Sequence, residues 1–135
     1  MPKYNLEKIT VENFRVFSDF STFSVRPITF LTGTNSSGKT SLLKVLTLLK
    51  HGSYSNFERL EFGGENLELG SFESCKTHDS KEEKLSFGLH FDFAEPLLLD
   101  NIKFFSNHIL LNLDYKKQVE DGTLVNLNII GLNEH

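Results

Sequence analysis

The stretch Gly33-Thr34-Asn35-Ser36-Ser37-Gly38-Lys39-Thr40 decides the fold. It follows a short continuous apolar run over residues 28–31, which is typical of a strand buried on both faces. Residues 41–50 come after it and present a wide apolar face, so they predict a helix that covers a sheet. A buried strand, a glycine-containing loop and a helix are therefore expected in direct succession.

The loop fits the spacing G-x-x-x-x-G-K-[ST], which is typical of a phosphate-binding loop, or P-loop. Gly33 and Gly38 permit the tight turns and positive φ angles that bring several backbone N–H groups to one anion. Lys39 would reach the β- and γ-phosphates of a nucleotide, and the Thr40 hydroxyl would ligate Mg²⁺. Ser41 would contact the α-phosphate. The alternative interpretation is a polar loop with an incidental lysine.

The rest of the chain predicts mainly β-structure. Residues 84–93 alternate apolar and polar side chains, as a half-buried strand does, and residues 109–115 and 125–129 repeat the pattern. Two earlier strands are expected over residues 4–12 and 20–25. The back half is therefore predicted to be an antiparallel sheet or meander, whereas residues 53–83 are expected to be loops with short structured pieces.

Composition narrows the function classes. The 135 residues, with a formal net charge of −4, suit one globular domain. Residues 1–60 hold 8 Lys and Arg against 4 Asp and Glu, whereas residues 61–135 hold 6 against 14, so the basic chemistry lies with the loop. No apolar stretch is long enough to span a membrane, and no signal peptide is recognisable, so a cytoplasmic protein is expected. The single cysteine, Cys75, excludes an internal disulfide.

The order of these features resembles a known family. A first strand, the turn Asn13-Phe14-Arg15, two further strands and then the P-loop are similar to the N-terminal lobe of ABC-type ATPase heads. The SMC/RecF-like group and the OLD-like bacterial AAA/ABC ATPases are the most similar. The resemblance spans residues 6–75, including the segment 59–72, and extends more loosely to 130. It implies an α/β fold: a partial P-loop NTPase with a mixed sheet, an antiparallel β-subdomain and one main P-loop helix.

The resemblance also implies roles for further residues. Arg15 matches a basic residue near the nucleotide phosphates, although a solvated turn arginine is the alternative. Asn35 matches an asparagine close to the γ-phosphate. Ser36 and Ser37 would contribute mainly backbone N–H groups. The implied cofactors are ATP and Mg²⁺.

Several family elements are not recognisable. Hydrolysis in such heads requires an apolar strand ending in two carboxylates, the Walker B motif, and the run 97–100 only imitates it. The signature motif, the D-loop and the switch histidine are not found, and Gln118 is a weak candidate for the Q-loop glutamine. Residues 1–135 are therefore interpreted as an N-terminal ATP-binding lobe that does not hydrolyse ATP alone.

The expected partners follow from that interpretation: ATP, a second copy or a partner ATPase chain, DNA only through a complete protein, and no membrane. A non-catalytic interaction module that docks onto a partner ATPase chain is the alternative function. A P-loop kinase or GTPase is disfavoured because the guanine-reading Asn-Lys-x-Asp motif is missing and the strands before the P-loop are not expected in those folds. Cys75, His78 and Asp79 lie close in sequence, as a possible ligand cluster or Cys–His pair, but a polar loop is the favoured interpretation.

Overall fold

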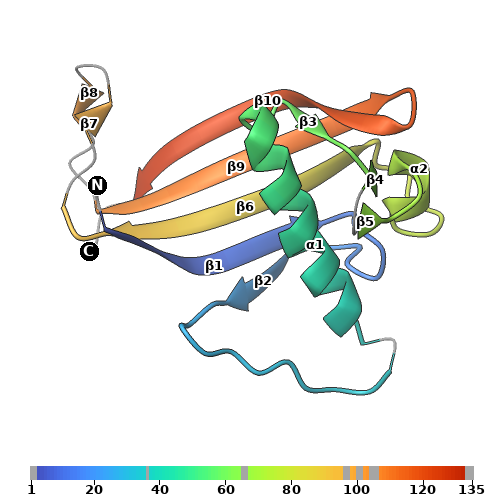
Figure 1. Cartoon of the computed structure of the whole chain (residues 1–135), viewed down its shortest axis with the longest axis horizontal. Helices are drawn as coiled ribbons and strands as arrows, with labels where there is room; N and C mark the ends of the chain where they lie inside the picture. The colour runs from blue at the N-terminus through green and yellow to red at the C-terminus, as the bar shows by residue number, and fades with distance from the viewer. Residues whose placement is uncertain are drawn as a thin grey trace.

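The computed structural model describes residues 3–35, 37–64, 67–95, 98–99, 102–103 and 107–132. Its main feature is a six-stranded sheet in which every neighbouring pair is antiparallel. The strands lie in the order β2 (Ser21–Ser24), β1 (Tyr4–Glu12), β6 (Lys84–Phe93), β9 (His108–Gln118), β10 (Asp121–Leu132) and β3 (Arg59–Leu60). The long helix α1 (Lys39–Gly52) lies across one face of this sheet (Figure 1).

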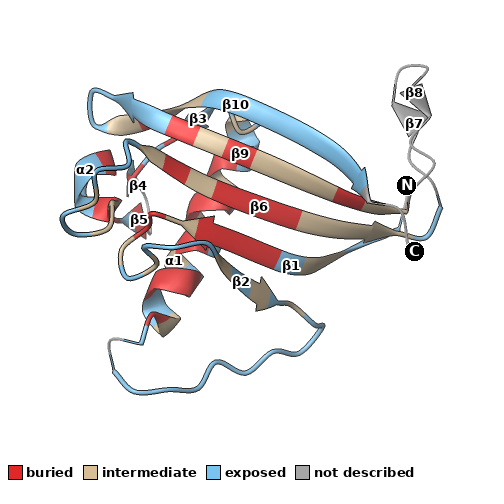
Figure 2. Ribbon diagram, turned by 180° about the vertical axis from the view of Figure 1, so that it is seen from behind, coloured by how far each residue is buried: buried red, intermediate tan, exposed pale blue. Residues whose placement is uncertain are grey.

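The predicted alternation sets the hydrophobic core. Leu85 and Phe87 of β6 are buried on the face that carries the apolar residues of the strand, and Val45 and Leu48 of α1 are fully buried in the same cluster. Burial of each such side chain contributes about 1.5–3 kcal/mol. Buried positions gather along α1, toward the C-terminal end of β1 and in the first half of β6 (Figure 2). The predicted helix and the strands over 4–12, 20–25, 84–93, 109–115 and 125–129 are confirmed.

The expected buried strand over residues 28–31 is wrong. No strand is formed there, and the segment runs as extended chain away from the sheet (Figure 1). Ile28 is 75% exposed and Phe30 is 85% exposed. An apolar run becomes a buried strand only when neighbouring strands pair with it, and the described residues supply no such neighbour. The mixed sheet and the P-loop NTPase fold class therefore stay predictions.

The region 53–83 contains short elements, as expected. They are η1 (Ser53–Ser55), β3, the hairpin β4 (Gly63–Gly64) with β5 (Leu67–Glu68), and α2 (Phe72–Cys75). Ser71 begins α2 with a capping box, in which Ser71 and Ser74 satisfy each other's backbone N–H groups. Outside the main sheet, β7 (Leu98–Leu99) pairs with β8 (Ile102–Lys103). In the described residues no helix is long and apolar enough to cross a membrane.

A tight turn follows β1 and lies against the N-terminus of α1. Phe14 and Phe17 exchange two backbone hydrogen bonds of 3.0 and 2.9 Å. Asn13 anchors the turn, because its buried side-chain amide donates to the backbone oxygens of Glu82 and Lys84 at 3.0 and 2.8 Å. This turn and α1 together position the loop that precedes the helix.

Candidate phosphate-binding site

The loop before α1 turns sharply at its two glycines. Gly33 has φ 147° and Gly38 has φ 98°, values that side-chain-bearing residues rarely adopt. Gly38 also lies against the turn after β1. A Cβ atom at Gly38 would be 2.8 Å from Cζ of Phe17 and 2.9 Å from Cγ2 of Val16. Glycine is therefore required at this position both for the backbone angle and for the close approach.

The N-terminus of α1 carries no side-chain cap. Gly38 precedes the helix without a side chain to accept a hydrogen bond, and the first turn contains no acidic residue. The first helical hydrogen bond runs from the N–H of Leu42 to the carbonyl of Gly38 at 2.9 Å. The preceding N–H groups have no acceptor within the helix. They point, with the positive end of the helix dipole, toward the space before the helix, which favours an anion there.

Lys39 lies over the loop. Its ammonium Nζ donates to the backbone oxygens of Gly33 and Thr34 at 2.6 and 2.7 Å, and Ser37 Oγ is 3.5 Å away. All three partners are neutral. Among the described residues no carboxylate forms an ion pair with Lys39, so its positive charge is not neutralised. An incoming anion could exchange for the two carbonyl groups.

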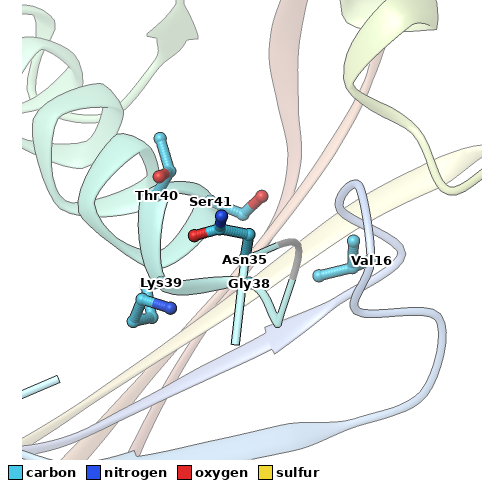
Figure 3. Close-up of a pocket in the computed structure, with 6 residues that line it drawn as sticks. All are labelled: Val16, Asn35, Gly38, Lys39, Thr40 and Ser41. Atoms are coloured by element: carbon cyan, nitrogen blue, oxygen red, sulfur yellow. The ribbon is translucent and has the colours of Figure 1, made fainter. Parts of the chain in front are cut away.

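A cavity of about 240 Å³ opens at this place (Figure 3). It is lined by six residues: Val16, Asn35, Gly38, Lys39, Thr40 and Ser41. None of them is acidic, and most of the wall is polar. The volume is below the range of about 300–1,000 Å³ that is usual for pockets enclosing a whole small molecule. The cavity therefore matches the phosphate part of a nucleotide better than the entire nucleotide.

Most of the residues predicted from the motif come together here. Asn35, Gly38, Lys39, Thr40 and Ser41 line the cavity. Gly33, through its carbonyl, and Ser37, through its hydroxyl, contact the Lys39 ammonium from the loop. Ser36 lies outside the described residues.

Arg15 has different surroundings. Its backbone N–H donates to the carbonyl of Cys75 at 2.8 Å, and its guanidinium lies beside the Cys75 thiol. Burial raises the pKa of that thiol, and the charges of Arg15 and Lys44 oppose the rise. Arg15 does not line the cavity, whereas its neighbour Val16 does. Sequence reasoning missed Val16, because only the folded turn brings it to the helix.

The other candidate groups do not form a site in the described residues. Cys75 is fully buried, whereas the His78 and Asp79 side chains are 93% and 89% exposed and pair with each other at 3.0 Å. No group of three His, Cys, Asp or Glu side chains there could hold a metal ion. Leu97 and Asp100, the ends of the Walker B imitation, lie outside the described residues. Gln118 ends β9.

The loop turns at two glycines, its lysine has no ion pair in the part of the chain that the structure describes, and the helix after it begins without a cap. These features, around a cavity that no acidic residue lines, are typical of nucleotide-binding ATPases. A family model described as an AAA ATPase domain matches residues 5–130. Because this match covers nearly the whole chain, the chain belongs to the AAA ATPase domain family, which implies nucleotide binding of the ATPase type. No curated protein and no solved structure matches the chain significantly.

Proposed function

We propose that this chain binds Mg-ATP through residues 33–41, as the N-terminal part of an ABC/SMC-like ATPase of the RecF or OLD type. One observation carries the proposal: Lys39 and the uncapped N-terminus of α1 line the same cavity, and no carboxylate lines it. The charge of Lys39 and the positive end of the helix dipole, with no carboxylate beside them, favour the binding of a polyphosphate.

The residues present fit the proposed ligand. Lys39 would hold the terminal phosphates as a point charge, and the backbone N–H groups before and within the first helical turn would donate to phosphate oxygens. Thr40, which lines the cavity, would ligate Mg²⁺ through its hydroxyl, and Mg²⁺ bound there would offset the phosphate charge. Asn35 would donate its amide to the terminal phosphate. Ser41 would contact the phosphate nearest the nucleoside.

Hydrolysis requires a group that orients and deprotonates water, and phosphate binding alone does not supply it. The residues that line the cavity include no Asp or Glu. We therefore propose that the water-orienting carboxylate and the signature motif come from outside residues 1–135. The biological setting that we propose is a DNA-repair or phage-defence system, with DNA contacted only through the complete protein.

A second candidate function is a non-catalytic module that docks onto a partner ATPase chain. The observation in its favour is the exposed apolar run, with Ile28 75% and Phe30 85% exposed, together with Leu43 of α1, which is 53% exposed. Such side chains on a soluble protein are typical of a contact surface. Under this proposal the loop would bind no nucleotide until the partner is present.

The test is calorimetric titration of Mg-ATP into three proteins: the whole chain, Lys39→Ala and Lys50→Ala. Lys50 is the matched control, since it lies in the last turn of α1, away from the cavity. We expect Lys39→Ala to weaken binding at least about tenfold, which is the effect of one lost charge-assisted hydrogen bond, whereas Lys50→Ala should bind like the unmodified chain. Equal affinity of all three proteins would refute the phosphate site. No binding by the folded chain would favour the docking module.

A further inference from the structure

The connecting segment, residues 75–84, runs from the last residue of α2 to the first residue of β6 and lies beside the turn after β1, residues 13–17. Four hydrogen bonds join the two: the Asn13 amide donates to the carbonyls of Glu82 and Lys84 at 3.0 and 2.8 Å, the Arg15 N–H donates to the carbonyl of Cys75 at 2.8 Å, and the Thr77 hydroxyl donates to the carbonyl of Phe17 at 3.2 Å. The first, third and fifth residues of the turn are thus held by a segment that lies 60–71 residues further along the sequence.

These hydrogen bonds hold a strained backbone. Asn13 and Arg15 have φ 59° and 52°, in the left-handed region. Asparagine adopts this region readily, whereas arginine does so rarely. The cost of one left-handed residue and the gain from one hydrogen bond are of similar size, so the loss of a single bond can change the conformation of the turn. Strain of this kind persists only where surrounding contacts enforce it.

The opposite side of the turn lies against the phosphate site. Val16 extends from the turn toward the N-terminus of α1 and lines the cavity (Figure 3). Val16 and Phe17 approach Gly38 so closely that a Cβ there would clash with both side chains. The carbonyl that accepts from Thr77 therefore belongs to a residue whose ring lies against Gly38, although Thr77 itself does not line the cavity.

We propose that the connecting segment sets the geometry of the phosphate site through the turn, with Asn13 and Thr77 as positioning residues. When one of their hydrogen bonds is lost, the turn no longer fixes the backbone of Gly38, after which α1 begins. Only the fraction of molecules whose first helical N–H groups are aligned then binds phosphate at full affinity. The choice of ligand rests on the proposed function, whereas the link between the turn and the loop does not.

Thr77 allows this link to be tested without damage to the hydrophobic core. It is half-buried and does not belong to the core cluster. Valine has nearly the same shape as threonine but lacks the hydroxyl, whereas serine keeps the hydroxyl. The matched control is Thr47→Val. The Thr47 hydroxyl donates to the carbonyl of Leu43 at 3.1 Å within α1, so the same substitution removes a hydrogen bond that does not involve the turn.

The first test needs no nucleotide. The ¹H–¹⁵N amide signals of residues 38–40 are compared between the unmodified chain and the three threonine variants. We expect Thr77→Val to shift or broaden these signals, because the backbone before α1 is no longer fixed. Thr77→Ser should restore them, and Thr47→Val should leave them in place, since Thr47 lies about 10 Å further along the helix. Unchanged signals in a folded Thr77→Val variant would overturn the proposal.

The second test is calorimetric titration of Mg-ATP into the same proteins. Thr77→Val should bind about 2- to 10-fold more weakly, the effect of one hydrogen bond, whereas Thr77→Ser and Thr47→Val should differ from the unmodified chain by less than about twofold. Asn13→Gly is a second variant, because glycine keeps the left-handed backbone and removes both amide hydrogen bonds. It should bind at least as weakly as Thr77→Val.

The two tests separate this inference from the proposed function. Equal Mg-ATP affinity of the unmodified chain and of folded Thr77→Val and Asn13→Gly would overturn the positioning role and leave the phosphate site intact. Shifted amide signals in Thr77→Val, with no Mg-ATP binding by any of the proteins, would refute the Mg-ATP site and support the link between the segment and the loop.

Discussion

Replacement of Gly38 by alanine tests the link between the turn after β1 and the loop before α1. Gly38 has φ 98°, and an L-residue with a left-handed backbone costs about 1–2 kcal/mol. The added Cβ would lie 2.8 Å from Cζ of Phe17 and 2.9 Å from Cγ2 of Val16, well inside the contact distance of about 3.5–4.0 Å between carbons. Overpacking of this kind costs about 1–3 kcal/mol. We therefore expect Gly38→Ala to lower the free energy of unfolding by about 2–5 kcal/mol.

The assay is urea unfolding followed by circular dichroism, with Gly63→Ala measured beside it. A Cβ at Gly63 would meet no atom within 4 Å, and the φ of this residue is not positive. Gly63→Ala should therefore be neutral or slightly stabilising, since it only restricts the unfolded chain. A Gly38→Ala variant within about 0.5 kcal/mol of the unmodified chain would refute the reasoning, because that is the range of an ordinary surface substitution.

Two further predictions concern the sheet. Gly88 of β6 faces Thr10 of β1, and a Cβ at Gly88 would collide with the Thr10 hydroxyl. Gly88→Ala should therefore lower the free energy of unfolding by about 1–3 kcal/mol. Thr10→Ala in the same chain should recover most of that loss. Additive effects in the urea titrations would contradict this. Tyr115 is fully buried and donates to the carbonyl of Phe57 at 2.8 Å, and burial raises its pKa. The folded state therefore keeps this phenol neutral above pH 10, where the unfolded chain ionises it. The contribution of Tyr115 to the free energy of unfolding is complete below about pH 10, and above that pH it falls by up to about 1.4 kcal/mol per pH unit. Tyr115→Phe should flatten that decline in unfolding free energy between pH 9 and 11, and an unchanged slope would contradict the assignment.

The sequence was sufficient where one local pattern determines the structure. Strand β6 has the bounds that its alternation predicts, Lys84–Phe93, because side chains on one face must all be buried together. The loop and helix were also predictable, since the glycine and lysine positions and the apolar face of residues 41–50 lie within one short stretch. Four residues of the motif, together with Ser41 directly after it, line the cavity for that reason.

Other features depend on partners far away in the chain. Strand β3 has two residues and forms because Arg59 and Leu60 pair with β10, at Thr123 and Gly122. Val16 lines the cavity only because the anchored turn folds against Gly38. The run 28–31 is a strand that was predicted but does not form. Its composition is that of a buried strand, but burial requires neighbouring strands, and composition does not show whether these are present.

The exposed run and the phosphate loop are physically connected. Residues 28–31 lead directly into Gly33, so whatever fixes that run also fixes the loop from its N-terminal side. The helix fixes the loop only from the other side, at Gly38. The Lys39 ammonium, held by the carbonyls of Gly33 and Thr34, bridges the two sides. A chain that paired with residues 28–31 would therefore reduce the entropy that the loop loses on binding a phosphate. The two candidate functions are then coupled. Docking of a partner would strengthen nucleotide binding, and by linkage bound nucleotide would strengthen docking.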